Sequence, residues 1–323
     1  MSDLKYVYAV ARIRVKEKYL LNDADVSMMV GMKDEKSVLN YLVDRGWGDA
    51  NATQNADQVL GTEEQKTVSL MHELKVDQSI FDVLTYPQIY HNLKAGIKQI
   101  CSGEKYSNIF YDLDQYGEEE MLRILKDKDY DALPKGMRQV ARRAYGVMLE
   151  TMDGQKCDVL VDRACLDAML RASKKSKSKL IRQYEESTVA VTDIKIAVRA
   201  NKTGKSLQFL KEALAPCDSL DVDALAVAAA KNEEDLYEYL SKHGYEEAAL
   251  AIKESPSAFE RWCDNRLIET IRPQKTNPAS ADPIVAYYLA RQNEIKTARI
   301  ILTAKANGFS EDQTRERVRM MYV

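Results

Sequence analysis

The chain has 323 residues and a formal net charge of −3, and charged residues make up 30% of it. A charge this close to neutral provides no basic field that would hold nucleic acid, so we expect the partners to be proteins. Only 13 glycines and 7 prolines occur, a balance that predicts an all-helical fold.

The sequence gives no signal for secretion, for a membrane span or for a metal site. Its first residues lack the basic-then-apolar order of a signal peptide, and no apolar run is long enough to cross a bilayer. The five cysteines include no CxxC pair, and the three histidines are scattered. We therefore expect a cytoplasmic protein without a cofactor, whose cysteines are small core residues.

Two kinds of helix are predicted in the first third of the chain. The earlier one carries Val38 and Leu42 after Glu35, and Trp47 follows five residues beyond Leu42. Because residues four apart share a helix face, Val38 and Leu42 should pack into a core. The aromatic side chain should cover the end of that helix.

The later helix is predicted over residues 89–100, with Pro87 near its start and Gly103 after its end. Asn92 lies four residues before Gly96 and shares its face. A glycine lets another backbone approach closely, and a polar side chain beside it must then find a hydrogen-bond partner. We expect either a helix crossing here or a polar position that faces a partner protein.

Both kinds of helix recur in the middle third. The first recurs as Glu118, Met121, Leu125 and Tyr130, and the second as Asp193, Lys195 and Ala197, on a helix from Ala190 to a stop at Gly204.

A basic run between these two helices is the strongest local charge feature. It consists of Lys174, Lys175, Lys177 and Lys179. The run lacks interleaved aromatic residues, which argues against a platform for single-stranded nucleic acid. It is either a solvated inter-helix loop or a contact for acidic protein loops or lipid headgroups.

The tripeptide Gly204-Lys205-Ser206 resembles the end of a phosphate-binding loop. That loop needs the pattern GxxxxGK[ST] after a strand, with the first glycine for a tight turn. Position 199 is arginine, and the preceding segment is predicted to be helical. We therefore interpret Gly204 as the C-terminal cap of a helix and expect no nucleotide binding.

The last third carries the third copy of each helix. The first kind appears as Glu233, Leu236, Leu240 and Tyr245. The second begins after Asp282 and Pro283, reaches about Ala306, and carries Glu294, Lys296 and Ala298. Arg299 stands where the other copies have Ile97 and Val198, so this helix should present a different face.

The spacing of the copies indicates an internal repeat. Positions 92, 193 and 294 are separated by 101 residues both times. Two interleaved patterns, each found three times, predict three tandem helical repeats of about 100 residues. We place them at residues 1–106, 107–207 and 208–323.

Several segments resemble one known family. Residues 283–308 with 315–319 are similar to the C-terminal signature of the C subunit of V-type and archaeal A-type ATPases, called the d subunit in eukaryotes. Residues 86–94 and the opening residues 6–14 resemble the same family, so the likeness covers the whole chain.

The resemblance implies a non-catalytic protein, not an enzyme. It implies an all-α, three-domain funnel with pseudo-threefold symmetry that receives the central-stalk shaft subunits in its mouth. The funnel would rest on the membrane rotor ring, peripheral to the cytoplasmic face of a membrane, and couple the two during proton or sodium ion transport. The alternative from the repeats alone is an α-solenoid scaffold for protein interactions, unrelated to ion transport.

The resemblance also suggests roles for the repeated polar residues. Glu294, Lys296 and Arg299 could form a polar inner wall that contacts the stalk, or they could make interdomain hydrogen bonds. The corresponding positions of the other repeats are Asn92, Lys94, Asp193, Lys195 and Arg199. The basic run from Lys174 to Lys179 could touch ring loops or headgroups. No catalytic, cofactor-binding or metal-binding residue is predicted.

Overall fold

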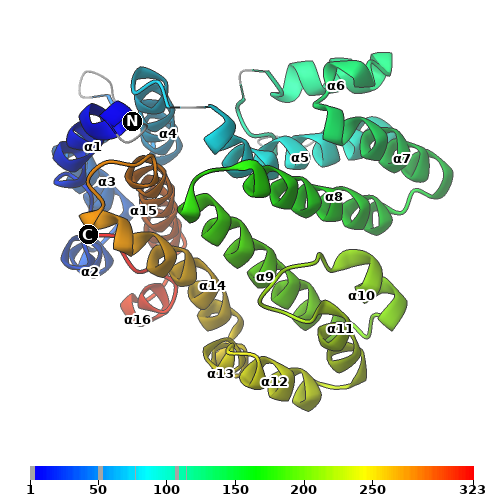
Figure 1. Ribbon diagram of the computed structural model, residues 1–323. Helices are drawn as coiled ribbons and strands as arrows, with labels where there is room; N and C mark the ends of the chain where they lie inside the picture. Colours follow the sequence, from blue (N-terminus) through cyan, green and yellow to red (C-terminus); the bar gives the residue numbers. More distant parts are fainter. Residues whose placement is uncertain (1–3, 50–53, 77, 106–108, 114) are drawn as a thin grey trace. The chain divides into compact units, whose positions relative to one another are not determined.

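The computed structural model describes residues 4–49, 54–76, 78–105, 109–113 and 115–323. These residues form helices joined by turns and short loops, and no β-strand occurs among them (Figure 1). The prediction of an all-helical fold is therefore confirmed. The chain divides into two compact units, and the division into three repeats remains a prediction.

Unit 1 combines both ends of the chain. It comprises Met1–Asp77, Ser178–Tyr184 and Gly244–Val323. Its helices are α1 (Leu4–Glu17), α2 (Asp23–Gly31), α3 (Glu35–Asp44), α4 (Ala56–Glu73), α13 (Glu246–Glu254), α14 (Pro256–Ile271), η2 (Arg272–Thr276), α15 (Asp282–Ala306) and α16 (Glu311–Arg315).

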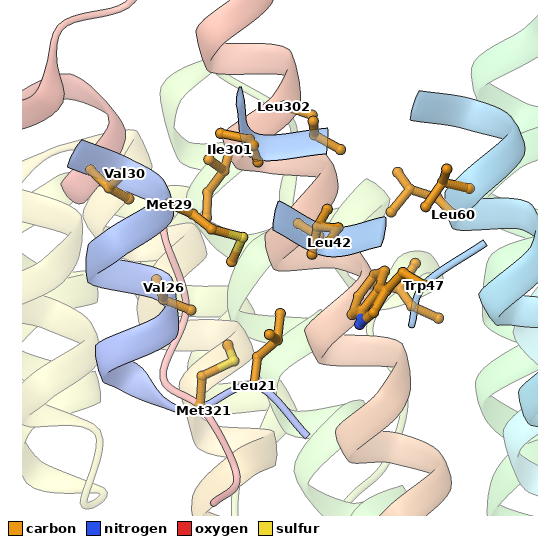
Figure 2. Packing of buried hydrophobic residues seen from close by; sticks show 14 residues of the cluster. Leu21, Val26, Met29, Val30, Leu42, Trp47, Leu60, Ile301, Leu302 and Met321 are labelled. Carbon is orange, nitrogen blue, oxygen red and sulfur yellow. The ribbon is translucent and has the colours of Figure 1, made fainter. Parts of the chain in front are cut away.

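Helix α15 is central to unit 1. It packs against α1, α3, α4 and α14, and most of its side chains are buried (Figure 1). One core cluster joins Ala298 and Ile301 of α15 to Val38 and Leu42 of α3. Figure 2 shows Ile301 and Met29 meeting in this cluster. The first predicted helix therefore buries the face that its i, i+4 spacing indicates.

Unit 2 comprises Gln78–Lys177 and Glu185–His243. Here α5 packs against α6, α7 and α8, and α11 packs against α10 and α12. The helices are α5 (Gln78–Ser102), α6 (Glu118–Asp127), η1 (Tyr130–Ala132), α7 (Lys135–Thr151), α8 (Gly154–Lys175), α10 (Leu207–Ala213), α11 (Val222–Lys231) and α12 (Glu233–Lys242), together with α9 (Lys179–Lys202), which belongs to this unit from Glu185 onward.

Gly96 marks a close contact between α5 and α6. A methyl carbon placed on Gly96 would lie 2.7 Å from Leu125 Cδ1 and 3.3 Å from Met121 Cγ. The small residue of one sequence pattern thus meets the apolar pair of the other. A helix crossing was one of the two expectations for this position, and the corresponding residues Ala197 and Ala298 are also fully buried.

The predicted start of one helix was wrong. α5 begins at Gln78, so Pro87 lies inside it and not near its start. Proline in a helix interior removes a backbone hydrogen bond at a cost of about 3 kcal/mol. Burial of the neighbouring Val83, Tyr90 and Leu93 offsets that cost, because these side chains are 0 to 2% exposed.

The predicted helix ends agree better with the structure. Gly103 and Gly204 follow α5 and α9 with φ of +71° and +63°, the left-handed conformation of a glycine cap. The Lys205 N–H bonds to the Ala200 carbonyl 2.9 Å away and closes that turn. Gly204 is therefore a helix cap, as its sequence context indicated. α15 ends at Ala306, as predicted, and begins at Asp282, two residues before the predicted start.

The cysteines and the basic run were predicted only in part. Cys157, Cys165 and Cys263 are buried, whereas Cys101 and Cys217 are half-buried. In the basic run, Lys174 and Lys175 lie in the last turn of α8, and Lys179 is the first residue of α9. The loop between the two helices therefore consists of residues 176–178 and is shorter than the run itself. Four lysines of the run are exposed: Lys174, Lys175, Lys177 and Lys179.

Candidate functional site

The polar residue of each long helix holds a loop. Asn92 on α5 is fully buried. Its Oδ1 accepts from the Tyr111 N–H at 2.8 Å, and its Nδ2 donates to the carbonyls of Tyr111 and Tyr116, each at 2.8 Å. The amide therefore joins the chain before α6 to the middle of α5.

Asp193 makes the corresponding contact from α9. Its Oδ1 accepts from the Ala215 N–H at 3.0 Å, on the segment between α10 and α11. Its second oxygen, Oδ2, is buried and has no hydrogen-bond partner among the described residues. Burial raises the pKa of this carboxyl to about 7, although the Ala215 N–H and the Arg163 guanidinium act in the opposite direction.

Glu294 repeats the arrangement on α15. One of its carboxylate oxygens accepts from the Leu21 N–H, on the turn before α2, and the other pairs with Arg291. Arg291 also pairs with Glu63 of α4, and its guanidinium lies 4.9 Å from the centre of the Trp47 ring. Burial raises the pKa of Glu294 to about 7, against the pull of Arg291.

These three contacts are alike in kind. Asn92, Asp193 and Glu294 each accept a backbone N–H from a loop within their own unit. A buried polar side chain that is used in this way helps to fix the loop. This geometry favours a packing role for the three residues over exposure on a polar inner wall.

The cationic residues near these positions lie at the surface. Lys94 bonds to Asp162 of α8 at 2.8 Å. Lys296 bonds to Asp264 of α14 at 2.7 Å, whereas Arg299 bonds to Asp57 of α4 at 2.9 Å. Lys296 and Arg299 thus engage different neighbours of α15, and do not share one partner. Exposed ion pairs of this kind contribute little to stability.

Three of the predicted cations line one cavity. Lys94, Lys195 and Arg199 surround a hollow of about 610 Å³ in unit 2, between α5, α8, α9 and α10. Apolar side chains also line it, among them Val159 and Leu166 of α8. The cavity is open to solvent and large enough for side chains of a partner protein.

The buried charge cluster of unit 1 was not predicted. Arg291 and Glu294 are three residues apart on α15, a spacing that could have indicated an ion pair. Glu63 is 228 residues away in the sequence, so its part in the cluster carried no local signal. The cluster borders a cavity of about 900 Å³ lined by Arg12, Lys16, Arg45, Lys66 and Arg291, with Glu63 and Glu73.

Neither a metal centre nor a membrane span is formed by the described residues. No group of three or more histidine, cysteine, aspartate or glutamate side chains is placed to hold a metal ion there. Among the same residues, no helix combines the length and the apolar character that crossing a membrane requires.

Comparison with known proteins gives one consistent result. The model of the family described as "ATP synthase (C/AC39) subunit" matches residues 9–317. The C subunit of the V-type sodium ATPase of Enterococcus hirae is 21% identical over 271 residues, which are 81% of this chain and 81% of that protein.

Two C subunits of A-type ATP synthases are also similar to this chain. The C subunit of the A-type ATP synthase of Halorubrum lacusprofundi is 27% identical over 239 residues, 69% of this chain and 68% of that protein. The C subunit of the A-type ATP synthase of Desulfurococcus is 22% identical over 348 aligned positions, 96% of this chain and 90% of that protein.

Proposed function

The chain belongs to the ATP synthase (C/AC39) subunit family, and on this premise we propose that it is a non-catalytic central-stalk subunit of a rotary V/A-type ATPase. In this role it couples the rotating shaft to the membrane rotor ring for proton or sodium ion transport. The observation that carries the proposal is the family match, which spans residues 9–317 and leaves little of the chain outside it.

Stiffness supports this role. A subunit that transmits torque must resist deformation, and closely packed helices have low compressibility. The loops held by Asn92, Asp193 and Glu294 add buried hydrogen bonds between long helices and the turns beside them. Such bonds reduce the freedom of loops that would otherwise absorb the applied force.

On the same premise we also propose an architecture for the chain. The chain is organised as three repeats, residues 1–106, 107–207 and 208–323, which together form a pseudo-threefold funnel. The equivalent loop contacts of Asn92, Asp193 and Glu294 support this division, because each stands at the corresponding place of its long helix.

The proposed contacts with partners follow from the exposed cations. Lys94, Lys195 and Arg199 line a cavity together with apolar side chains, and this combination suits amphipathic side chains of a shaft subunit. In unit 1, Lys296 and Arg299 are half-exposed on α15 and are further contacts for a shaft subunit. The basic run from Lys174 to Lys179 contacts ring loops or headgroups and keeps the protein peripheral to the membrane.

Isolation from native membranes tests the proposal. A tagged chain, expressed at its normal level in the host, should co-purify with shaft subunits and rotor-ring subunits of one ATPase. Membranes from a strain that lacks the chain should lose ATP-driven ion transport, while the catalytic part of the complex retains ATP hydrolysis. Recovery without any ATPase subunit, together with unchanged ion transport in the deletion strain, would falsify the proposal.

A further inference from the structure

A small cavity in unit 2 lies where three helices meet. It has a volume of about 260 Å³ and is lined by Tyr86 and Tyr90 of α5, Gly136 of α7, and Arg171 and Lys175 of α8. Cavities for drug-sized ligands usually have about 300 to 1,000 Å³. This one therefore suits a small chemical group better than a whole nucleotide.

The first turn of α7 opens onto this cavity. α7 is 17 residues long, and its N-cap residue, Pro134, makes no side-chain hydrogen bond to the turn. The first N–H groups of a helix lack the usual acceptor four residues earlier, and the helix dipole places partial positive charge there. The Met137 N–H bonds to the Pro134 carbonyl at 2.8 Å, so the N–H groups of Lys135 and Gly136 are the ones open to a ligand. Gly136 has no side chain that could shield its own N–H. The uncapped turn is thus a favourable place for an anion.

The buried hydroxyl of Tyr90 is an independent indication of a ligand. Tyr90 is 2% exposed, and its Oη has no hydrogen-bond partner among the described residues. A methyl carbon placed on Gly136 would lie 4.0 Å from this Oη and 3.7 Å from Arg171 Nη2. Both side chains therefore converge on the first turn of α7. An unsatisfied buried hydroxyl is destabilising, and an external acceptor would remove that cost.

The charge balance of the cavity favours an anion. The Arg171 side chain makes no hydrogen bond or ion pair with other residues in the part of the chain that the structure describes. Lys175 is exposed at the rim. Among the described lining residues Asp82 contributes the opposing carboxylate, so the cations outnumber it by two to one.

We propose that this cavity is a binding site for a phosphate group, held by the Lys135 and Gly136 N–H groups at the start of α7, the Arg171 guanidinium and the Tyr90 hydroxyl. A guanidinium matches a tetrahedral oxyanion with paired donors, and a hydroxyl adds a third direction of contact. The group comes from inorganic phosphate or from the headgroup of an anionic phospholipid. The lysines from Lys174 to Lys179 adjoin the cavity and attract either source.

Titration of the full chain with inorganic phosphate, followed by calorimetry and ³¹P NMR, tests the site. Wild type should show saturable binding and a higher melting temperature in phosphate. Arg171→Gln should weaken binding roughly 10- to 100-fold, because a charge-assisted contact is lost. Tyr90→Phe should weaken it about threefold to tenfold without lowering the melting temperature in phosphate-free buffer, since its hydroxyl has no partner there.

Arg143→Gln is the matched control, because Arg143 is exposed on α7 and lies outside the lining of this cavity. It removes the same charge as Arg171→Gln and should leave phosphate affinity unchanged. Equal phosphate affinity in all four proteins means that phosphate binds elsewhere, as an adventitious ion only, and would count against the site.

Sedimentation with phosphatidylglycerol vesicles distinguishes the two sources. If the site takes headgroups, Arg171→Gln and Tyr90→Phe reduce vesicle binding more than Arg143→Gln does, and inorganic phosphate competes. If it takes free phosphate, vesicle binding is the same in the three variants while phosphate affinity differs. The proposal is overturned if neither phosphate nor vesicles distinguish the two cavity variants from the control.

Discussion

Asn92, Asp193 and Glu294 hold loops in the same way but differ in charge. The amide of Asn92 uses its oxygen as acceptor and its nitrogen as donor, so all its polar atoms have partners. Asp193 offers two acceptors to a place where the described residues supply one donor, the Ala215 N–H. The buried carboxylate is therefore disfavoured relative to its protonated form, which raises its pKa to about 7.

This difference predicts a pH dependence of stability. A carboxyl with a folded-state pKa of about 7 binds its proton more tightly when folded than when unfolded, where the pKa is 3.8. The free energy of unfolding that this tighter proton binding contributes is fully present below about pH 4 and is lost as the pH rises toward 7. Asp193→Asn should therefore gain stability relative to wild type over this range, by on the order of 3 kcal/mol.

Chemical denaturation of both proteins between pH 4 and pH 8 measures the effect. Asp44→Asn is the control, since Asp44 is exposed at the end of α3 and the substitution removes the same charge. A constant difference between wild type and Asp193→Asn across the range would mean that Asp193 titrates as an ordinary surface carboxyl.

The buried arginine of unit 1 gives a second prediction. Arg291 lies between Glu63 and Glu294, and all three are buried. Arg291→Leu should lower the free energy of unfolding by about 3 to 5 kcal/mol, because two carboxylates would remain buried without their cation. Adding Glu63→Gln and Glu294→Gln should recover part of this loss, which urea denaturation would show.

Arg12→Leu supplies the comparison for that series. Arg12 pairs with Glu73 at 2.8 Å, but both side chains are substantially exposed. Its loss should cost less than about 1 kcal/mol. If Arg291→Leu were no worse than Arg12→Leu, the three buried groups would not act as one cluster.

At the scale of elements, the two sequence patterns meet at two of the three small residues, Gly96 and Ala298. Gly96 of α5 meets Met121 and Leu125 of α6, and Ala298 of α15 shares a cluster with the apolar pair of α3. Helix periodicity was sufficient to predict these faces, because an i, i+4 pair must lie on one side.

Other features of the elements had no local signal. The early start of α5 was missed because proline in a helix interior is unfavourable, and only burial of its neighbours makes it tolerable. The loop partners of Asn92 and Asp193 were also beyond prediction, since hydrogen bonds over 19 and 22 residues depend on how the loop folds.

Leucine substitutions at the three small residues test the contacts between helices. Gly96→Leu should destabilise the fold by about 1 to 3 kcal/mol, because even a methyl carbon there lies 2.7 Å from Leu125 Cδ1. Ala197→Leu and Ala298→Leu should behave similarly, since both alanines are fully buried.

Gly146 provides a control in the opposite direction. It lies inside α7, and a methyl carbon there would have no neighbour within 4 Å. Gly146→Ala should therefore raise stability by about 0.5 to 1 kcal/mol through helix propensity. Thermal melting of all four variants would show one gain and three losses, and two unaffected substitutions among the three would refute the equivalence of the small residues.

At the scale of the whole molecule, the sequence indicated the fold class and the family more clearly than the arrangement of the core. The C-terminal signature lies on α15, whose bounds were predicted well because a proline opens the helix and a glycine follows it. The joining of the two chain ends was not foreseen. The contact between Glu294 and the Leu21 N–H spans 273 residues, and repeat spacing does not specify such pairings.

The proposed stalk contact can be tested without disturbing the fold. Arg299 pairs with Asp57, whose side chain is 87% exposed, so Arg299→Glu should leave the melting temperature near that of wild type. If Arg299 faces the stalk, the variant should bind shaft subunits about tenfold more weakly, and ATP hydrolysis should lose part of its coupling to ion transport.

Arg315→Glu serves as the reference for this experiment, because Arg315 is equally exposed, at 46%, and lies on α16. It should not change shaft binding. A large fall in the melting temperature of Arg299→Glu would instead assign Arg299 to packing between helices and leave the stalk-binding surface to other residues.

The shared core of the two chain ends also determines the order in which the protein can fold during translation. Met321 packs with Leu21 and Val26, and the Met321 N–H bonds to Asp23 at 3.0 Å. Every residue of unit 2 leaves the ribosome before α15 does. In a nascent chain, the apolar faces of α2 and α3 that pack on α15 therefore stay uncovered until α15 has been synthesised, and exposed apolar surface of this kind is prone to aggregation.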